Sequence, residues 1–187
     1  MKKIVILFSG SGTNLAYILE NMHGREVEVV SVITNNPDAG GISHALKHGI
    51  VPVVIDHREF PDRESFDERL VREIERHRPD LTVLAGFMRI LTPQFTRRVH
   101  AINLHPSLLP RHRGLHAIER SYEDEHDSGG VTVHIVSDEL DAGDIVLSRE
   151  VDKRGMDFDT YHSTIRKIEK EALADGIRSV LGMKMSS

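Results

Sequence analysis

Two side chains that can stabilise an oxyanion lie close together in residues 101–110, Ala-Ile-Asn-Leu-His-Pro-Ser-Leu-Leu-Pro. Asn103 and His105 are two residues apart, so on an extended backbone both point to the same side. A carboxamide N–H and an imidazolium N–H can then converge on one developing negative charge. Asp141 lies in the acidic turn 138–143, and a neighbouring carboxylate raises the pKa of a histidine and favours its cationic form. This set predicts an acyl-transfer site that needs no covalent intermediate.

A simpler interpretation exists for each half of this set. Asn103 and His105 fit a polar strand end with satisfied hydrogen bonds, and residues 138–143 fit an ordinary acidic hairpin. However, Pro106 and Pro110 make the loop after His105 rigid, which a plain connection does not require. The two segments together therefore favour catalysis.

Other histidines and a serine indicate no second chemistry. Pairs with metal-like spacing are His112 with His116 and His126 with His134. Without an HExxH motif or a cysteine, we expect no metal site. Ser107 lacks a G-x-S-x-G setting, so a serine hydrolase is not expected either.

A glycine-rich loop, Ser-Gly-Ser-Gly-Thr-Asn at residues 9–14, follows the first expected strand and opens the first expected helix. Glycines let a ligand approach the backbone, and free N–H groups at a helix N-terminus favour a phosphate. Thr13 or Asn14 is expected to cap this helix. The loop matches neither G-x-G-x-x-G nor a P-loop, so it indicates either a monophosphate cradle or a tight structural turn.

Residues 84–91, Leu-Ala-Gly-Phe-Met-Arg-Ile-Leu, close the fourth expected strand. Ligands of open α/β sheets bind beyond the carboxyl ends of the strands. The apolar side chains of this loop are suited to line a slot for a flat heterocycle. Core packing is the simpler interpretation of the loop taken alone.

The composition is that of a soluble globular protein, with 187 residues, 39% hydrophobic and 28% charged. Its 24 basic and 29 acidic residues give a net charge of −5, which argues against a general nucleic-acid binder. The absence of cysteine excludes a thiol nucleophile, a disulfide framework and a thiolate metal site. No apolar run approaches the roughly 20 residues of a membrane span, and we expect a cytoplasmic enzyme.

Hydrophobic periodicity predicts strands and helices that alternate through the first half of the chain, as in a parallel sheet with right-handed crossovers. The expected strands there are 4–8, 27–33, 51–55 and 81–85, and the expected helices are 14–22, 42–47 and 64–77. The second half is expected to add a short helix 93–99, a strand 102–105, a helix 115–124, strands 131–136 and 145–151, and a long helix 158–181. We predict one α/β domain over residues 1–187, with a mostly parallel twisted sheet, helices on both faces, a Rossmann-like N-terminal half and mixed C-terminal strands.

Several of these strings occur together along nearly the whole chain. They are residues 8–15, 63–64, 84–91, 102–110, 132–134 and 138–143. With them the chain resembles the phosphoribosylglycinamide formyltransferases, folate-dependent enzymes of purine synthesis. The Asn-x-His-Pro-Ser-Leu-Leu-Pro string with a downstream Asp is similar to folate formyltransferases generally, whereas the strings at 9–14 and 85–91 are more specific.

The resemblance implies three sets of site residues. The implied catalytic residues are Asn103, His105 and Asp141. The implied ribonucleotide-binding residues are Gly12, Thr13, Asn14, Ile168, Glu169, Lys170 and Glu171. The implied folate-binding residues are Arg63, Met88, Arg89, Ile90, Leu91, Asn103, Ser137, Asp138, Glu139, Leu140 and Asp141. About residues 1–100 would then form a phosphate-binding half, and about 101–187 a catalytic and folate-binding half.

The sequence departs from the family pattern at two places. After Pro110 it has His112-Arg113 where the family often has a Tyr-Pro or Phe-Lys type of dipeptide. After Glu171, the common His and Tyr-Pro positions are taken by Ala172 and by Asp and Gly at 175–176.

The resemblance also implies the reaction. The neutral amine of N1-(5-phosphoribosyl)glycinamide would attack the formyl carbon of 10-formyltetrahydrofolate, with Asn103 and protonated His105 on the oxyanion and Asp141 keeping the imidazole cationic. The folate is a co-substrate, and no metal is expected. The expected partners are small molecules, with no nucleic acid and no membrane, and a homodimer is left open.

Three other functions share part of this pattern. Formyltetrahydrofolate deformylase, a hydrolase, has the same trio but usually carries an N-terminal regulatory domain. Methionyl-tRNA formyltransferase needs a C-terminal tRNA-binding domain. A folate- or nucleotide-binding module without catalysis is the third, and the intact trio speaks against it.

Overall fold

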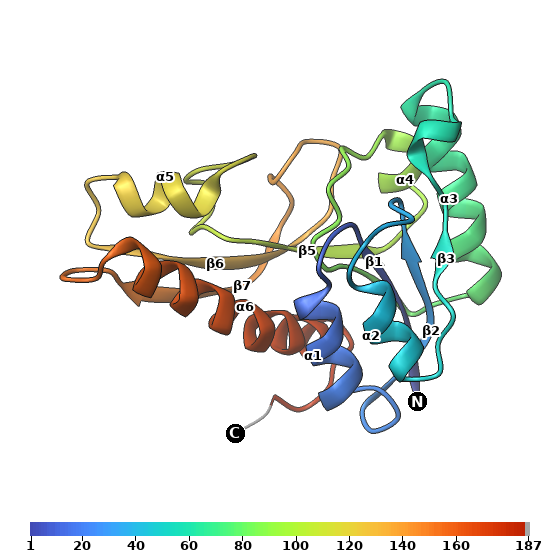
Figure 1. Ribbon diagram of the computed structural model, residues 1–187, viewed down its shortest axis with the longest axis horizontal. Coiled ribbons are helices and arrows are strands. Elements are labelled where there is room, and N and C mark those ends of the chain that lie inside the picture. The colour runs from blue at the N-terminus through green and yellow to red at the C-terminus, as the bar shows by residue number, and fades with distance from the viewer. Residues whose placement is uncertain (186–187) are drawn as a thin grey trace. The chain divides into compact units, whose positions relative to one another are not determined.

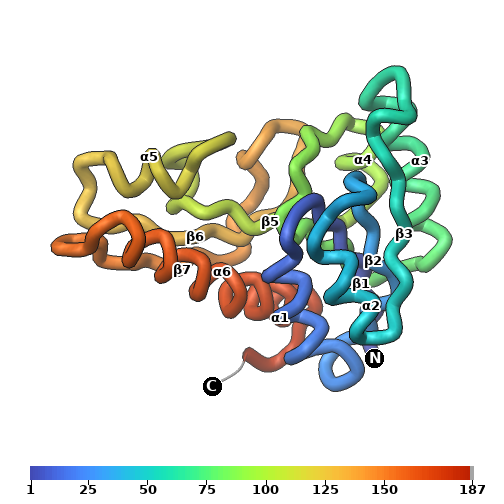
Figure 2. The backbone as a smooth tube through the Cα atoms, viewed as in Figure 1, coloured from blue at the N-terminus to red at the C-terminus, as the bar shows by residue number. Residues whose placement is uncertain are grey.

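The computed structural model describes residues 1–185 and contains two compact units, Met1–Ile102 and Asn103–Ser187. The division falls within strand β5 (Ala101–His105). Figure 1 labels the elements of each unit, and Figure 2 traces the backbone that joins them.

The first unit is built on parallel strands in the order β3-β2-β1-β4. These are β1 (Lys2–Phe8), β2 (Val27–Thr34), β3 (Val53–Val54) and β4 (Leu81–Leu84). The last five residues of β1 are completely buried. A continuous buried run is typical of a parallel strand that is covered on both faces, which places the centre of this unit's core at β1.

Helices connect these strands, as the alternating pattern predicts. They are α1 (Thr13–Asn21), α2 (Ile42–Lys47), the 3-10 turn η1 (His57–Glu59), α3 (Arg63–His77) and α4 (Pro93–Thr96). Helix α1 lies beside α2, and α3 lies beside α4 (Figure 1). In α3, Asp62 caps the N-terminus by accepting a hydrogen bond from the Ser65 N–H at 2.8 Å. The buried side of α3 contains the apolar residues Phe66, Leu70 and Ile74.

Two elements of this unit are shorter than expected. Strand β3 has two residues rather than the predicted 51–55. Val51 is exposed, and Pro52 has no N–H to donate to a neighbouring strand. Helix α4 ends at Thr96, before the predicted end at residue 99, and the Arg98 N–H bonds the Phe95 carbonyl three residues earlier, as in a turn.

The second unit contains β5, β6 (Ser128–Ile135) and β7 (Ile145–Asp152) in that order, with α5 (Ala117–Glu123) and α6 (Phe158–Val180). Strands β6 and β7 are antiparallel, with Ser128 opposite Asp152. Helix α6 packs on both strands. At Gly176 a Cβ atom would lie 2.6 Å from the Val133 side chain, so this close approach requires glycine.

Across residues 1–185, no helix combines the length and apolar character needed to cross a membrane.

Candidate active site

His105 lies at the end of β5 with a polar group near each of its ring nitrogens. Its Nε2 lies 2.8 Å from the carbonyl oxygen of His112, and its Nδ1 lies 3.4 Å from Asp141 Oδ2. A carbonyl can only accept, so Nε2 carries a hydrogen and donates it. Nδ1 is therefore the nitrogen that gains or loses a proton. The side chain is only 6% exposed, which keeps it out of bulk water.

Asp141 sits in the turn between β6 and β7 with a left-handed backbone, at φ 52°. Its Oδ2 accepts the backbone N–H of Gly114 at 2.9 Å, in addition to facing His105. Its Oδ1 lies 3.6 Å from Nε2 of His134. The sequence-predicted carboxylate thus reaches the predicted histidine.

His134 on β6 connects the predicted trio and was not predicted as a site residue. Its Nδ1 donates to the carbonyl of Ile135 at 3.0 Å, which leaves Nε2 to accept from Asn103 Nδ2 at 3.3 Å. Asn103, His134, Asp141 and His105 therefore form one contiguous polar chain. His134 is buried, with 2% of the residue exposed.

A signal for His134 was present in the sequence, in the alternation of polar residues along β6. Thr132 and His134 are two apart and share a face of the strand. Thr132 Oγ1 donates to the Ser107 carbonyl at 2.7 Å and accepts from the Leu109 N–H at 3.0 Å. This face thus fixes the loop that follows His105.

Burial decides the charge of the site, and it corrects one expectation. Burial lowers the pKa of His105, which outweighs the carbonyl of His112 and the carboxylate of Asp141, both of which raise it. The expectation of a cationic imidazole in the resting protein is therefore wrong. Burial also raises the pKa of Asp141, but the nearby His134 ring and the hydrogen bond from the Gly114 N–H outweigh it and hold this pKa below its usual value. The resting site pairs an ionised carboxylate with a largely neutral imidazole.

The two residues that depart from the family pattern after Pro110, His112 and Arg113, both have partners. The Nε2 of His112 lies 2.5 Å from Asp124 Oδ2. Lys153 also binds Asp124, with its Nζ 2.6 Å from Oδ1. Arg113 donates to Glu139 Oε1 at 2.8 Å, which ties its segment to the turn that contains Asp141. This anchored segment supplies the carbonyl that holds the ring of His105.

The implied folate residues of the turn are more exposed than Asp141. Ser137 donates from Oγ to the Glu139 carbonyl at 3.1 Å, and Leu140 is half exposed. An apolar side chain on an exposed turn is available to cover a ligand.

In the first unit, the glycine-rich loop differs from expectation at the helix start. The N-cap of α1 is Gly12, at φ 70°, with no side-chain cap, so the expected cap by Thr13 or Asn14 is wrong. A Cβ on Gly12 would lie 2.6 Å from the Cα of Gly41, so the loop geometry requires glycine. Asn14 Oδ1 is buried and has no hydrogen-bond partner within residues 1–185. The first N–H groups of α1 thus have no capping side chain, as an anion cradle requires.

The loop after β4 is tied to the glycine-rich loop by Ser9. Ser9 N–H donates to the Gly86 carbonyl at 3.0 Å, and Ser9 Oγ accepts from the Met88 N–H at 2.8 Å. Phe87 is buried, as the core-packing interpretation expects, whereas Met88 and Ile90 are exposed. The loop therefore both completes the core and presents apolar side chains outward.

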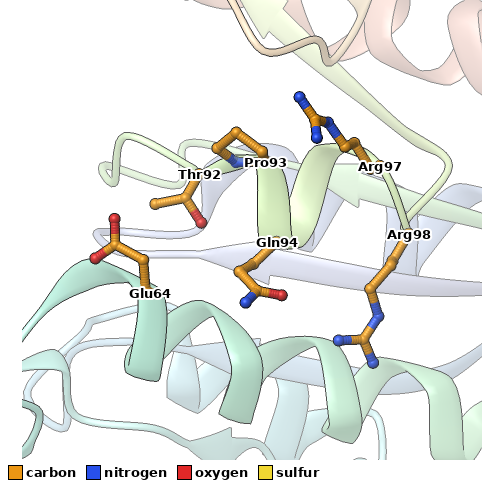
Figure 3. A pocket seen from close by; sticks show the side chains of 6 residues that line it. All are labelled: Glu64, Thr92, Pro93, Gln94, Arg97 and Arg98. Atoms are coloured by element: carbon orange, nitrogen blue, oxygen red, sulfur yellow. The ribbon is translucent and has the colours of Figure 1, made fainter.

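Arg63 is the first residue of α3 and is exposed. A hollow of about 450 Å³ lies between α3 and α4, lined by Glu64, Thr92, Pro93, Gln94, Arg97 and Arg98 (Figure 3). Arg98, which lines this hollow, forms two ion pairs. Its Nη1 lies 2.6 Å from Glu68 Oε2, and its Nη2 lies 2.8 Å from Glu75 Oε2. None of the implied site residues lines this hollow, so its size alone does not make it the active site.

The implied ribonucleotide contacts on α6 do not share one environment. Glu169 is buried, with Arg166 Nη1 at 3.1 Å from each carboxylate oxygen. Glu171 is exposed, and Ile168 and Lys170 are partly exposed. Consecutive helical residues point in different directions, so these four side chains do not face a single ligand together.

Known proteins are similar to this chain in sequence and in fold. The chain matches the formyl transferase family over residues 2–177. It is 40% identical over 152 residues to phosphoribosylglycinamide formyltransferase of Escherichia coli, which covers 79% of this chain and 72% of that protein. It is 39% identical over 155 residues to the Haemophilus influenzae protein of the same name, covering 81% and 73%. The crystal structure of phosphoribosylglycinamide formyltransferase from Campylobacter jejuni aligns with a TM-score of 0.94 and 44% identity, covering 96% of this chain and 97% of that chain. The chain belongs to the formyl transferase family.

Proposed function

We propose that this protein transfers the formyl group of 10-formyltetrahydrofolate to the amino group of N1-(5-phosphoribosyl)glycinamide, a step of de novo purine biosynthesis. The observation that carries the proposal is the polar chain Asn103–His134–Asp141–His105 in a family of formyl transferases. Relatives named for this activity support the choice of acceptor. The protein acts on small molecules, and its proposed place of action is the cytoplasm.

The first chemical step is attack of the neutral amine on the formyl carbon. A carbon–nitrogen bond forms, and the carbonyl electron pair moves onto oxygen. The attacking nitrogen becomes acidic and gives a proton to Nδ1 of His105, which is free to accept it because Nε2 already holds a hydrogen. Asp141, 3.4 Å away, stabilises the imidazolium that results.

The tetrahedral intermediate then carries its negative charge beside two donors, the Nδ1–H of His105 and the Nδ2 hydrogen of Asn103 that does not bind His134. Such donors each contribute roughly 3–4 kcal/mol to transition-state stabilisation. When the intermediate collapses, the bond from carbon to N10 of the folate breaks and the Nδ1 proton passes to N10. Formylated ribonucleotide and tetrahydrofolate are released, and His105 is neutral again.

The binding roles follow from the same proposal. Residues Gly12, Thr13 and Asn14 hold the ribonucleotide phosphate, using the uncapped N–H groups of α1. For the folate the proposed contacts are Arg63, the exposed loop 88–91 and the turn 137–141. Of the four implied residues on α6, we propose the exposed Glu171 as the ribonucleotide contact.

A single assay tests this function. Purified protein is mixed with 10-formyltetrahydrofolate, and tetrahydrofolate formation is followed with and without the ribonucleotide. Turnover that requires the ribonucleotide and yields its formylated product is the expected result. Turnover in water alone would instead identify a deformylase, and binding without turnover would identify a non-catalytic module.

A further inference from the structure

The buried carboxylate of Asp67 on α3 holds the far end of the loop after β4. Asp67 is 1% exposed, and its Oδ2 accepts both the backbone N–H of Thr92 at 2.6 Å and the Thr92 hydroxyl at 2.8 Å. Ser9 holds the beginning of the same loop through Gly86 and Met88. The loop 88–91 is thus anchored at both ends.

Thr92 is used in an unusual way at this position. It is the N-cap residue of α4, where a threonine hydroxyl ordinarily accepts a hydrogen bond from the helix. No such side-chain cap is present, and the hydroxyl donates to Asp67. Burial raises the pKa of Asp67 above its usual value, and the two hydrogen bonds from Thr92, which lower it, only partly offset this effect. A buried polar group is costly unless it is hydrogen-bonded, and both printed partners of this carboxylate belong to Thr92, at the end of the loop.

A second contact joins the same helix to the middle of the loop. The guanidinium carbon of Arg89 lies 5.2 Å from the centre of the Phe66 ring, over its face. Phe66 immediately precedes Asp67 on α3, and Arg63 lies one helical turn earlier. Through the contacts of Phe66 and Asp67, helix α3 holds its first residue, Arg63, at a fixed position relative to the loop 88–91. Both parts are proposed folate contacts.

We propose that Asp67 is a positioning residue for folate binding, which sets the distance between Arg63 and the loop 88–91 through its bonds to Thr92. This inference rests on the proposed function, since it assumes that these two parts bind the folate. Asp67 touches no substrate in this role. Its effect is confined to the affinity for the folate and does not extend to the ribonucleotide.

Three variants separate this role from a general structural one. Asp67→Leu removes both acceptor oxygens at similar volume, Thr92→Val removes only the hydroxyl, and Asp67→Asn keeps an oxygen that faces Thr92. We expect the KM for 10-formyltetrahydrofolate to rise about 10- to 100-fold in Asp67→Leu, as for the loss of two buried hydrogen bonds, and less in the other two. The KM for the ribonucleotide and kcat should stay near the wild-type values. Glu73→Gln, which changes another buried carboxylate of α3, is the matched control with unchanged KM values.

Hydrogen exchange provides a readout that does not depend on activity. Backbone amides of residues 86–92 should exchange faster in Asp67→Leu and Thr92→Val than in wild type, with β1 unchanged. An unchanged folate KM in folded variants, or equal losses in both KM values and in kcat, would overturn the inference. If Asp67→Leu does not fold, Thr92→Val and Asp67→Asn decide it. Wild-type protein without ribonucleotide-dependent turnover would refute the proposed function, whereas unchanged exchange of residues 86–92 would refute the anchoring alone.

Discussion

Replacing Asp141 with Asn removes one charge from the site and keeps the shape of the side chain. His105 Nδ1 and Asp141 Oδ2 are 3.4 Å apart, and both side chains are over 90% buried. At an effective dielectric constant of about 20, Coulomb's law gives an attraction of about 5 kcal/mol between imidazolium and carboxylate. This is an upper bound, because Gly114 and His134 share the same carboxylate. A loss of about 3–5 kcal/mol corresponds to a fall of about 10²–10⁴ in kcat.

The variant should also shift the pH dependence in a defined direction. His105 must be neutral to accept the amine proton, so activity falls as the pH drops through the pKa of His105. Asp141 raises this pKa, whereas burial lowers it. In Asp141→Asn the carboxylate no longer raises the pKa of His105, so burial lowers this pKa further. The acidic limb of the rate profile should therefore move to lower pH.

The assay is kcat/KM for formyl transfer over roughly pH 5 to 9, combined with the NMR titration of His105. Asp144→Asn, an exposed carboxylate that follows the same turn, is the control and should leave the profile in place. An Asp141→Asn profile with the wild-type rate and an unmoved acidic limb would refute the electrostatic role of Asp141. A limb that moves to higher pH would contradict the sign derived from burial.

Two further predictions concern stability. Ser9→Ala removes the partner of the Met88 N–H and of Asn35 Oδ1, so the free energy of unfolding should fall by about 1–3 kcal/mol, measured by urea denaturation. Asp124→Asn leaves buried Lys153 without its counter-charge and should cost about 2–4 kcal/mol at neutral pH, by the same measurement. Burial raises the pKa of Asp124, but the bonds from Lys153 and a histidine outweigh it and hold this pKa far below the unfolded value. Its stabilising effect is therefore present above about pH 4 and lost as the pH falls further.

Each stability prediction has a control close by. Ser43→Ala removes one exposed hydrogen bond and should change the unfolding free energy by less than about 0.5 kcal/mol. Glu125→Gln changes an exposed neighbour of Asp124 and should have an equally small effect. A Ser9→Ala protein as stable as Ser43→Ala would show that the bond between the two loops contributes nothing. A cost of Asp124→Asn that does not shrink in acid would contradict the ionised state of Asp124.

The fold was predictable because the periodicity of hydrophobic residues and the positions of turn residues are local features of the sequence. Strands β1, β2 and β4 and helix α3 lie within a few residues of their predicted ranges, and the α/β fold and the family are confirmed by the solved relatives. Strand β3 was predicted too long because a proline breaks its pairing. A propensity for extended backbone does not by itself provide a partner strand.

The proximity of the proposed catalytic residues Asn103 and His105 was predictable from spacing, and their electrostatics were not. Asn103 and His105 needed only the two-residue period of a strand, whereas the contact of Asn103 with His134 depends on how β5 and β6 are placed. The lowered pKa of His105 depends on its burial, which the local sequence does not specify. The start of α1 was misassigned because Gly12 adopts a left-handed backbone that places the N-cap one residue before Thr13.

The central claim is that His105 takes and returns the proton during formyl transfer without being needed to bind the folate. The direct measurement compares wild type with His105→Asn in single-turnover formyl transfer to the ribonucleotide, with tetrahydrofolate affinity determined on the same samples. We predict a rate lower by about 10²–10⁴ and a Kd for tetrahydrofolate within about threefold of wild type. A His105→Asn protein that transfers formyl groups at the wild-type rate would contradict the account.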